Sequence, residues 1–296
     1  MSKIKLVMTD LDDTLLNSDK KISEANYQAI DRLIEKGVLV VPTTGRYYGG
    51  IPDELHEHTG IKYLVSSNGA MITNNETKEV ITMNAIATDI LYDIVAMAEA
   101  KAINIILVAD GQVVLDERIF DNPKYEKSDF LARMLGHGQT TGDVLNFLKE
   151  TDLTFKKLDL GFSDLEFRNE LYAKLKEYPG ISAVSSHASN IEITEANTSK
   201  GSALEYLIEM LELDRSEVLA IGDNDNDISM LQLAGIGVAM DNASEQVKSH
   251  SDAVTDNCNN DGFAKAINKV FDFWLFNKED NRNIMRNRSC VNKHVP

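Results

Sequence analysis

Residues 4–14 read IKLVMTDLDDT, and this stretch decides the fold class. Its first part, residues 4–9, is a short and mostly apolar run of the kind found in a buried β-strand. The run ends at an acidic segment in which Asp10 and Asp12 lie two positions apart. In a loop that follows a strand, both carboxylates can point into one cleft.

Two further short apolar strands are predicted at residues 38–41 and 63–65. Each one ends in a polar cluster, Pro42-Thr43-Thr44-Gly45-Arg46 after the first and Ser66-Ser67-Asn68-Gly69 after the second. A helix over residues 23–36, with Ser23 as N-cap and Gly37 as its stop, precedes residues 38–41. Alternating strands and helices predict a doubly wound parallel sheet that binds ligands at the carboxyl ends of its strands.

The middle of the chain, residues 84–190, follows a different pattern. Strand candidates at 103–109 and 112–115 flank Asp110-Gly111, which is a hairpin signal. Two more strands and a helix between them are predicted at residues 155–161, 181–185 and 165–178. This segment is therefore interpreted as an inserted α+β cap domain with an antiparallel sheet.

Regular alternation resumes after this insertion. A strand at 218–221 leads into Gly222-Asp223-Asn224-Asp225-Asn226-Asp227, followed by a strand at 236–239 and a last helix from about Gly262. The predicted fold class is α/β, with a Rossmann-like doubly wound parallel-sheet core interrupted by the cap. The core comprises residues 1–83 and 191–296, the cap residues 84–190. The polar tail from about 277 is interpreted as a mobile terminus.

Composition narrows the classes of function. The chain has 296 residues, of which 43% are hydrophobic, so a substantial core can form. A formal net charge of −17 disfavours nucleic acid as the main partner. Two cysteines without a CxxC pair predict neither a disulfide framework nor a zinc site. We find no signal peptide and no membrane-spanning segment, and we expect a cytoplasmic protein.

The acidic residues after the strands predict a metal site. If Asp10, Asp12, Asp223 and Asp227 meet at one sheet edge, each close pair of carboxylates repels by about 4 kcal/mol at 4 Å and an effective dielectric of 20. A cation would offset this repulsion. Hard oxygen ligands favour Mg²⁺, which commonly bridges to a substrate phosphate. A calcium-binding EF-hand loop starting at Asp223 is disfavoured, because its required Gly and Glu are absent.

These residues resemble the four motifs of the haloacid dehalogenase superfamily. Asp10-Leu11-Asp12-Asp13-Thr14 resembles motif I, Thr44-Gly45-Arg46 motif II, Lys200 the motif III lysine, and residues 222–227 motif IV. The large insertion between motifs II and III is similar to that of the Cof-type branch, which carries a C2-type cap. The resemblance extends over about residues 3–272.

The resemblance implies a role for each motif residue. Asp10 would be the nucleophile that forms an aspartyl-phosphate, and Asp12 the general acid and base. Mg²⁺ would be held by Asp10, by Asp12 through its backbone carbonyl, and by Asp223, with Asp227 supporting the metal shell. The other implied roles are phosphate binding by Thr44, Gly45, Lys200 and Asn226, and substrate binding by Arg46 and Asn68. Asn226 could serve phosphate or substrate.

Two residues depart from the family pattern. Asp13 and Asp241 stand where the family usually has glycine. Aspartate tolerates a positive φ better than most residues, so we expect the turns to survive.

The predicted function is a magnesium-dependent phosphatase acting on small phosphorylated metabolites, with sugar phosphates as the class the resemblance implies. Two alternatives stay open: a phosphotransferase or mutase on the same core, and a weakly active regulatory protein that binds a phosphometabolite. The predicted partner is a small phosphorylated molecule, with neither nucleic acid nor membrane, and a homodimer is left open.

Overall fold

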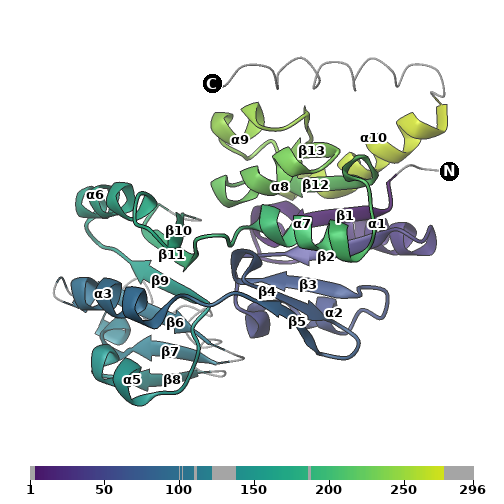
Figure 1. Ribbon diagram of the computed structural model, residues 1–296. Coiled ribbons are helices and arrows are strands. Elements are labelled where there is room, and N and C mark those ends of the chain that lie inside the picture. The colour runs from purple at the N-terminus through teal and green to yellow at the C-terminus, as the bar shows by residue number, and fades with distance from the viewer. Residues whose placement is uncertain are drawn as a thin grey trace, which may run out of the picture.

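The computed structural model describes residues 4–99, 101, 103–109, 112–121, 138–185 and 188–276, which form two sheets (Figure 1). The predicted turn at Asp110-Gly111 and the tail from 277 lie outside these residues. The larger sheet contains β1 (Leu6–Asp10), β2 (Leu39–Thr43), β3 (Tyr63–Ser66), β4 (Met71–Asn74), β5 (Val80–Met83), β12 (Val218–Gly222), β13 (Ile236–Ala239) and β14 (Ala253–Val254). Its strand order is β14-β13-β12-β1-β2-β3-β4-β5.

The parallel sheet predicted from the sequence is confirmed for β13, β12, β1, β2 and β3, and β14, which the sequence analysis did not predict, extends it in the parallel sense. The strands β4 and β5 continue the sheet in the antiparallel sense, and the sequence analysis did not predict them. They follow β3 directly through tight turns, as an antiparallel extension allows. The order of the parallel strands places the ends of β1, β2 and β12 side by side.

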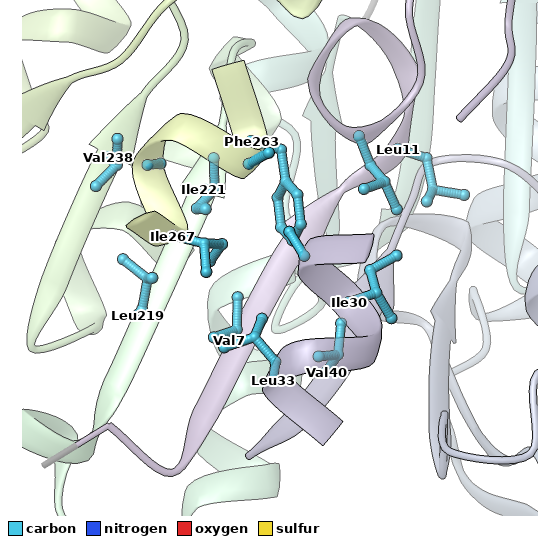
Figure 2. Packing of buried hydrophobic residues seen from close by; sticks show 14 of the residues in the cluster. Val7, Leu11, Ile30, Leu33, Val40, Leu219, Ile221, Val238, Phe263 and Ile267 are labelled. Carbon is cyan, nitrogen blue, oxygen red and sulfur yellow. The ribbon is translucent and has the colours of Figure 1, made fainter. Parts of the chain in front are cut away.

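Helices cover both faces of the larger sheet. One face carries α1 (Glu24–Glu35), α2 (Asp53–His56) and α10 (Gly262–Phe276), and the other α7 (Lys200–Met210), α8 (Ile228–Leu233) and α9 (Glu245–Ser249). Figure 2 shows how Phe263 and Ile267 of α10 meet Ile30 and Leu33 of α1 over Val7 of β1. The strand β1, which ends at Asp10, is therefore buried on both faces, and this packing fixes its end in place.

The helix α1 has the ends that the sequence predicts. The side chain of Ser23 accepts a hydrogen bond from the backbone N–H of Asn26 at 3.2 Å, as an N-cap does. Gly37 follows the helix with a φ of +77°, the left-handed conformation that ends many helices.

The smaller sheet belongs to the inserted segment. It contains β6 (Asn104–Val108), β7 (Val113–Asp116), β8 (Gly138–Thr141), β9 (Lys157–Gly161), β10 (Ile181–Val184) and β11 (Asn190–Glu195), in the order β10-β11-β9-β6-β7-β8. All pairs are antiparallel as expected except β7 with β8, which is parallel. The boundary drawn at residue 190 falls at the start of β11, and the whole of β11 pairs in this sheet.

The two faces of the smaller sheet differ. Alternate residues such as Leu158 of β9 and Ile191 of β11 pack under α3 (Thr88–Glu99), α5 (Val144–Glu150) and α6 (Leu165–Lys176). The opposite face packs Ile106 and Val108 against Tyr47 of the motif II loop and also carries charged residues. This face therefore meets the core domain.

Within the described part of the chain, no helix combines the length and the apolar character needed to cross a membrane.

Candidate active site

Lys200 joins two carboxylates at the carboxyl edge of the larger sheet. Its Nζ donates to Oδ1 of Asp10 at 2.5 Å and to Oδ1 of Asp227 at 2.6 Å, and its side chain is fully buried. Burial alone would lower the pKa of Lys200, but the charges of Asp10 and Asp227 raise it above its ordinary value. The lysine therefore stays protonated and holds the motif I carboxylate beside motif IV.

Burial and mutual repulsion disfavour the ionised forms of the carboxylates around Lys200. Burial and the nearby charge of Asp227 raise the pKa of Asp10 well above its ordinary value. Burial, followed by Asp227, raises the pKa of Asp223 to about 7. Burial and the charge of neighbouring carboxylates thus make the ionised form of each group unfavourable, and an additional positive charge would offset this cost.

Asp227 also shapes the motif IV loop. Its Oδ2 accepts hydrogen bonds from the backbone N–H groups of Asp223 and Asn224, each at 2.9 Å. Gly222 has to be small here, because a Cβ at that position would lie 2.4 Å from Cγ of Asp227. One carboxylate therefore anchors Lys200 and the loop that carries Asp223.

Three carboxylates are close enough to share one cation. Ligand oxygens of Asp10, Asp223 and Asp227 lie within 4.8 Å of one another. Oxygen donors of this kind fit Mg²⁺, and a divalent cation would offset the repulsion among these three carboxylates. The predicted contribution of the Asp12 backbone carbonyl stays a prediction.

The Asp12 side chain points to a different set of partners. Arg46 donates two hydrogen bonds of 2.7 Å to its carboxylate, from Nε and from Nη2, and Nζ of Lys20 lies 3.2 Å from Oδ1. Burial alone would raise the pKa of Asp12, but hydrogen bonds and charge from Arg46, together with Lys20, hold it below its ordinary value. Arg46, predicted to bind substrate, therefore also fixes the carboxylate of the predicted acid and base.

The motif II loop lies beside motif I because Asp10 pairs with Thr43 in the neighbouring parallel strand. Thr44 is buried, and its Oγ1 accepts from the backbone N–H of Arg46 at 3.1 Å. A Cβ at Gly45 would come within 2.9 Å of the side-chain oxygens of Asn68 and Glu192, so a larger residue would displace these two side chains. The predicted phosphate-binding residues of motif II thus lie next to Asp10, the predicted nucleophile.

The loop after β3 holds Asn68 in an unusual backbone conformation. Ser67, Asn68 and Gly69 have φ values of +52°, +57° and +98° in succession. Left-handed conformations in non-glycine residues cost of order 1–3 kcal/mol each and tend to occur at functional sites. The strain places the Asn68 amide against Asn226 of motif IV, whose Nδ2 donates to Asn68 Oδ1 at 3.0 Å.

The structure thus brings all predicted site residues to one edge of the larger sheet, and adds others that the sequence analysis did not single out. Thr14 donates to Asp223 at 2.9 Å, and Asn242 donates to the backbone carbonyl of Asp13 at 2.8 Å. Lys157 and Glu192 reach this edge from the cap, through Gly45 and Asn68 respectively. Thr14 stands in the motif I segment and Asn242 directly follows Asp241, so the sequence carried a usable signal for both. The cap residues had none.

Both departures from the family pattern have a structural explanation. Asp13 has a φ of +58°, the conformation for which glycine is usual, and its carboxylate lies 3.2 Å from Lys20. Asp241 is exposed and lies 3.7 Å from Lys248, and it is not left-handed. Only Asp13 therefore needs the tolerance for positive φ that the sequence analysis invoked.

Replacing Asp13 by glycine is expected to change the free energy of unfolding by no more than about 1 kcal/mol. Relief of the left-handed backbone is offset by greater chain entropy in the unfolded state and loss of an exposed ion pair. Asp13→Val, which is β-branched, should instead destabilise the protein by about 2 kcal/mol. Urea unfolding of the two variants checks this; equal stabilities would contradict it.

Comparison with known proteins identifies the family of this chain. Residues 7–267 match the family model of haloacid dehalogenase-like hydrolases. The chain is 33% identical over 273 residues to phosphatase YwpJ of Bacillus subtilis, covering 85% of this chain and 94% of the relative. It is 30% identical over 264 residues to 5-amino-6-(5-phospho-D-ribitylamino)uracil phosphatase YcsE of the same organism, covering 89% and 94%.

Solved structures show the same fold. A haloacid dehalogenase-like hydrolase from B. subtilis superposes with a TM-score of 0.79 at 28% identity, covering 89% of this chain and 99% of that one. Another from Bacteroides thetaiotaomicron gives a TM-score of 0.75 at 30% identity, covering 90% and 99%. The family identified from the four motifs is confirmed, and this chain belongs to the haloacid dehalogenase-like hydrolases.

Proposed function

We propose that this hydrolase is a magnesium-dependent phosphatase that acts on small phosphorylated metabolites, with sugar phosphates as the substrate class, through an aspartyl-phosphate intermediate. The observation that carries the proposal is the Asp10 carboxylate, held at 2.5 Å by a buried lysine and flanked by Asp223 and Asp227. The relatives named phosphatases support the reaction class, and YcsE is named for a substrate with a phosphorylated ribityl chain.

In the first step, a carboxylate oxygen of Asp10 attacks the phosphorus atom and forms a P–O bond, while the bond to the leaving alcohol breaks. The proton that the departing oxygen needs would come from the protonated form of Asp12, which Arg46 and Lys20 disfavour in the substrate-free protein, so this step requires these contacts to weaken when substrate binds. Lys200 lies against the attacking carboxylate and offsets negative charge that gathers on the phosphoryl oxygens. Thr44 and Gly45, which follow the neighbouring strand β2, would bind the phosphoryl oxygens.

In the second step, water attacks the phosphorus atom of the intermediate and gives its proton to Asp12. The bond between phosphorus and the Asp10 oxygen breaks, which releases phosphate and restores the carboxylate. The ionised form of Asp12, which Arg46 and Lys20 stabilise, is the form this step requires. Arg46 and Lys20 therefore act as positioning groups for the base.

The carboxylates of Asp10 and Asp223 and the backbone carbonyl of Asp12 would hold Mg²⁺, and Asp227 would support that set. The ion would supply positive charge that lets a dianionic phosphate approach four aspartates. Mg²⁺ is expected to stabilise the protein even without substrate, because it relieves repulsion among buried carboxylates.

The proposal is tested by phosphate release from a panel of phosphorylated metabolites, with and without Mg²⁺. Release by water identifies a phosphatase, transfer to a second sugar a phosphotransferase or mutase, and binding without turnover a regulatory protein. Only the first outcome supports the proposal.

A second readout does not depend on activity. At 100 times its dissociation constant, Mg²⁺ should add about 2.7 kcal/mol to the free energy of unfolding, which raises Tm by several degrees. Asp223→Asn should remove most of this shift, whereas Asp93→Asn, on an exposed face of α3, should retain it. An unchanged wild-type Tm in saturating Mg²⁺ would count against the metal site.

A further inference from the structure

Three side chains form a hydrogen-bonded chain from the cap to motif IV. Nδ2 of Asn68 donates to Oε2 of Glu192 in β11 at 2.5 Å, and Nδ2 of Asn226 donates to Oδ1 of Asn68 at 3.0 Å. All three residues are buried. This series of hydrogen bonds therefore ends at the side-chain amide of Asn226, the residue immediately before Asp227.

The direction of these hydrogen bonds is set by Glu192. A carboxylate oxygen can only accept, so Asn68 must turn its NH₂ group toward Glu192. Its carbonyl oxygen then faces Asn226, which must in turn present its own NH₂ group. Asn226 is left with its carbonyl oxygen, Oδ1, pointing away from the chain. Among the described residues, this buried atom has no hydrogen-bond partner.

Lys157 keeps Glu192 in the form that sets this direction. Its Nζ lies 3.0 Å from Glu192 and 3.2 Å from Asp159, and it donates to the backbone carbonyl of Gly45 at 2.7 Å. Burial would lower the pKa of Lys157, yet the two carboxylates raise it, so the ammonium persists and favours ionised Glu192. The contact with Gly45 ties this ion cluster to the motif II loop.

A buried carbonyl oxygen without a donor costs roughly 1–3 kcal/mol, so a ligand group that reaches this atom and donates to it would be bound favourably. A phosphate oxygen cannot fill it, because phosphate oxygens of a dianion accept hydrogen bonds as the amide oxygen does. The hydroxyl groups of an alcohol leaving group can. Asn226 precedes Asp227 in the sequence and is hydrogen-bonded to Asn68. The backbone N–H of Asn68 in turn donates to the backbone carbonyl of Thr44 at 2.9 Å, so Asn226 lies close to the predicted phosphate-binding residues.

We propose that Asn226 Oδ1 accepts a hydrogen bond from a hydroxyl group of the substrate's leaving group, and that Glu192 selects polyol phosphates by fixing the orientation of the Asn226 amide. Asn226 is thereby a specificity residue, and Glu192 and Asn68 are positioning residues that act through it. The inference rests on the proposed phosphatase function and names the feature of the substrate that this site recognises.

The test compares D-ribitol 5-phosphate and glycerol 1-phosphate with n-propyl phosphate, which has the same three-carbon chain as glycerol but no hydroxyl group. For the wild type in Mg²⁺, kcat/KM should be at least about tenfold higher for glycerol 1-phosphate than for n-propyl phosphate, and higher still for ribitol 5-phosphate. Equal values for the three substrates would overturn the inference, although hydrolysis of all three would still support the phosphatase.

Glu192→Gln removes the constraint, because a glutamine can donate or accept and lets the amides of Asn68 and Asn226 reverse. The ratio of kcat/KM for glycerol 1-phosphate to kcat/KM for n-propyl phosphate should fall toward one, mainly because kcat/KM for glycerol 1-phosphate decreases. Glu170→Gln, on an exposed face of α6, should keep the wild-type ratio. An unchanged ratio in folded Glu192→Gln would refute the positioning role.

A structural defect would lower activity on both substrates alike, so the ratio separates the two effects. The wild-type comparison stands even if Glu192→Gln fails to fold. Absence of phosphate release from every substrate would overturn the proposed phosphatase, and this inference with it.

Discussion

Replacing Asp10 with asparagine is expected to lower kcat for phosphate release by about 10⁴-fold or more while the chain stays folded. Asparagine has the same shape as aspartate, but its neutral amide cannot attack phosphorus to form the acyl-phosphate bond. Lys200 keeps its second partner, Asp227, so no buried ammonium is left alone. The measurement is phosphate release under saturating Mg²⁺ on the best substrate of the panel.

Stability provides the control for this variant. The pKa of Asp10 is raised in the folded state, so its ionised form destabilises the protein at every pH above its ordinary value. Removing that charge should leave the free energy of unfolding in EDTA unchanged or increase it. Asp93→Asn should match the wild type in both assays. Near-normal turnover by folded Asp10→Asn would refute the assignment of the nucleophile.

The site residues of the core domain could be predicted from the sequence because the polar residues of the site directly follow apolar strands there. Apolar strands stop abruptly at Asp10, Thr44 and Asp223, and parallel strands bring such ends to one edge. Lys200 came from the family resemblance. Its local sequence alone is that of an ordinary residue at the start of a helix.

The cap half could not be predicted, for a reason that lies in strand geometry. In β9 and β11, Lys157 and Glu192 alternate with apolar residues, and this pattern usually means a face exposed to water. Here that face is covered by the core domain, and both side chains are buried. Only the docking of two domains decides between a solvated and a buried charge, and a pattern within one strand carries no such information.

The β4–β5 hairpin was missed for a different reason. Its strands are short, and the polar residues 74–79 between them resemble a surface loop. Register with β3 gives them their strand conformation, since Tyr63 pairs with Asn74 and Ser66 with Met71. This is a tertiary effect that local propensity does not contain.

Replacing Lys200 with methionine is expected to damage both activity and stability. The loss of a positive charge beside the attacking carboxylate and the phosphoryl group should reduce kcat by about 10³-fold. In EDTA at pH 8, the free energy of unfolding should fall by about 3–5 kcal/mol, because Asp10 and Asp227 would remain buried without their shared ammonium. Lys174→Met, on an exposed face of α6, should show neither effect.

The stability loss should depend on pH in a direction that identifies its cause. Carboxyl groups with raised folded-state pKa values bind protons more tightly in the folded chain, so their destabilising effect is relieved as pH falls. Asp223, with a pKa of about 7, takes up its proton in the upper part of the range between pH 8 and pH 5.5. The difference between wild type and Lys200→Met should therefore narrow between pH 8 and pH 5.5 in urea unfolding.

Addition of Asp227→Asn to Lys200→Met gives a second check on the same physics. Removing one of the stranded carboxylates should recover part of the lost stability at pH 8, so the two substitutions should be strongly non-additive. Asp227 also holds the N–H groups of Asp223 and Asn224, which the asparagine oxygen can still accept, so the loop should persist. Additive losses, or a gap that is constant with pH, would show that Lys200 supports the fold through packing rather than through charge.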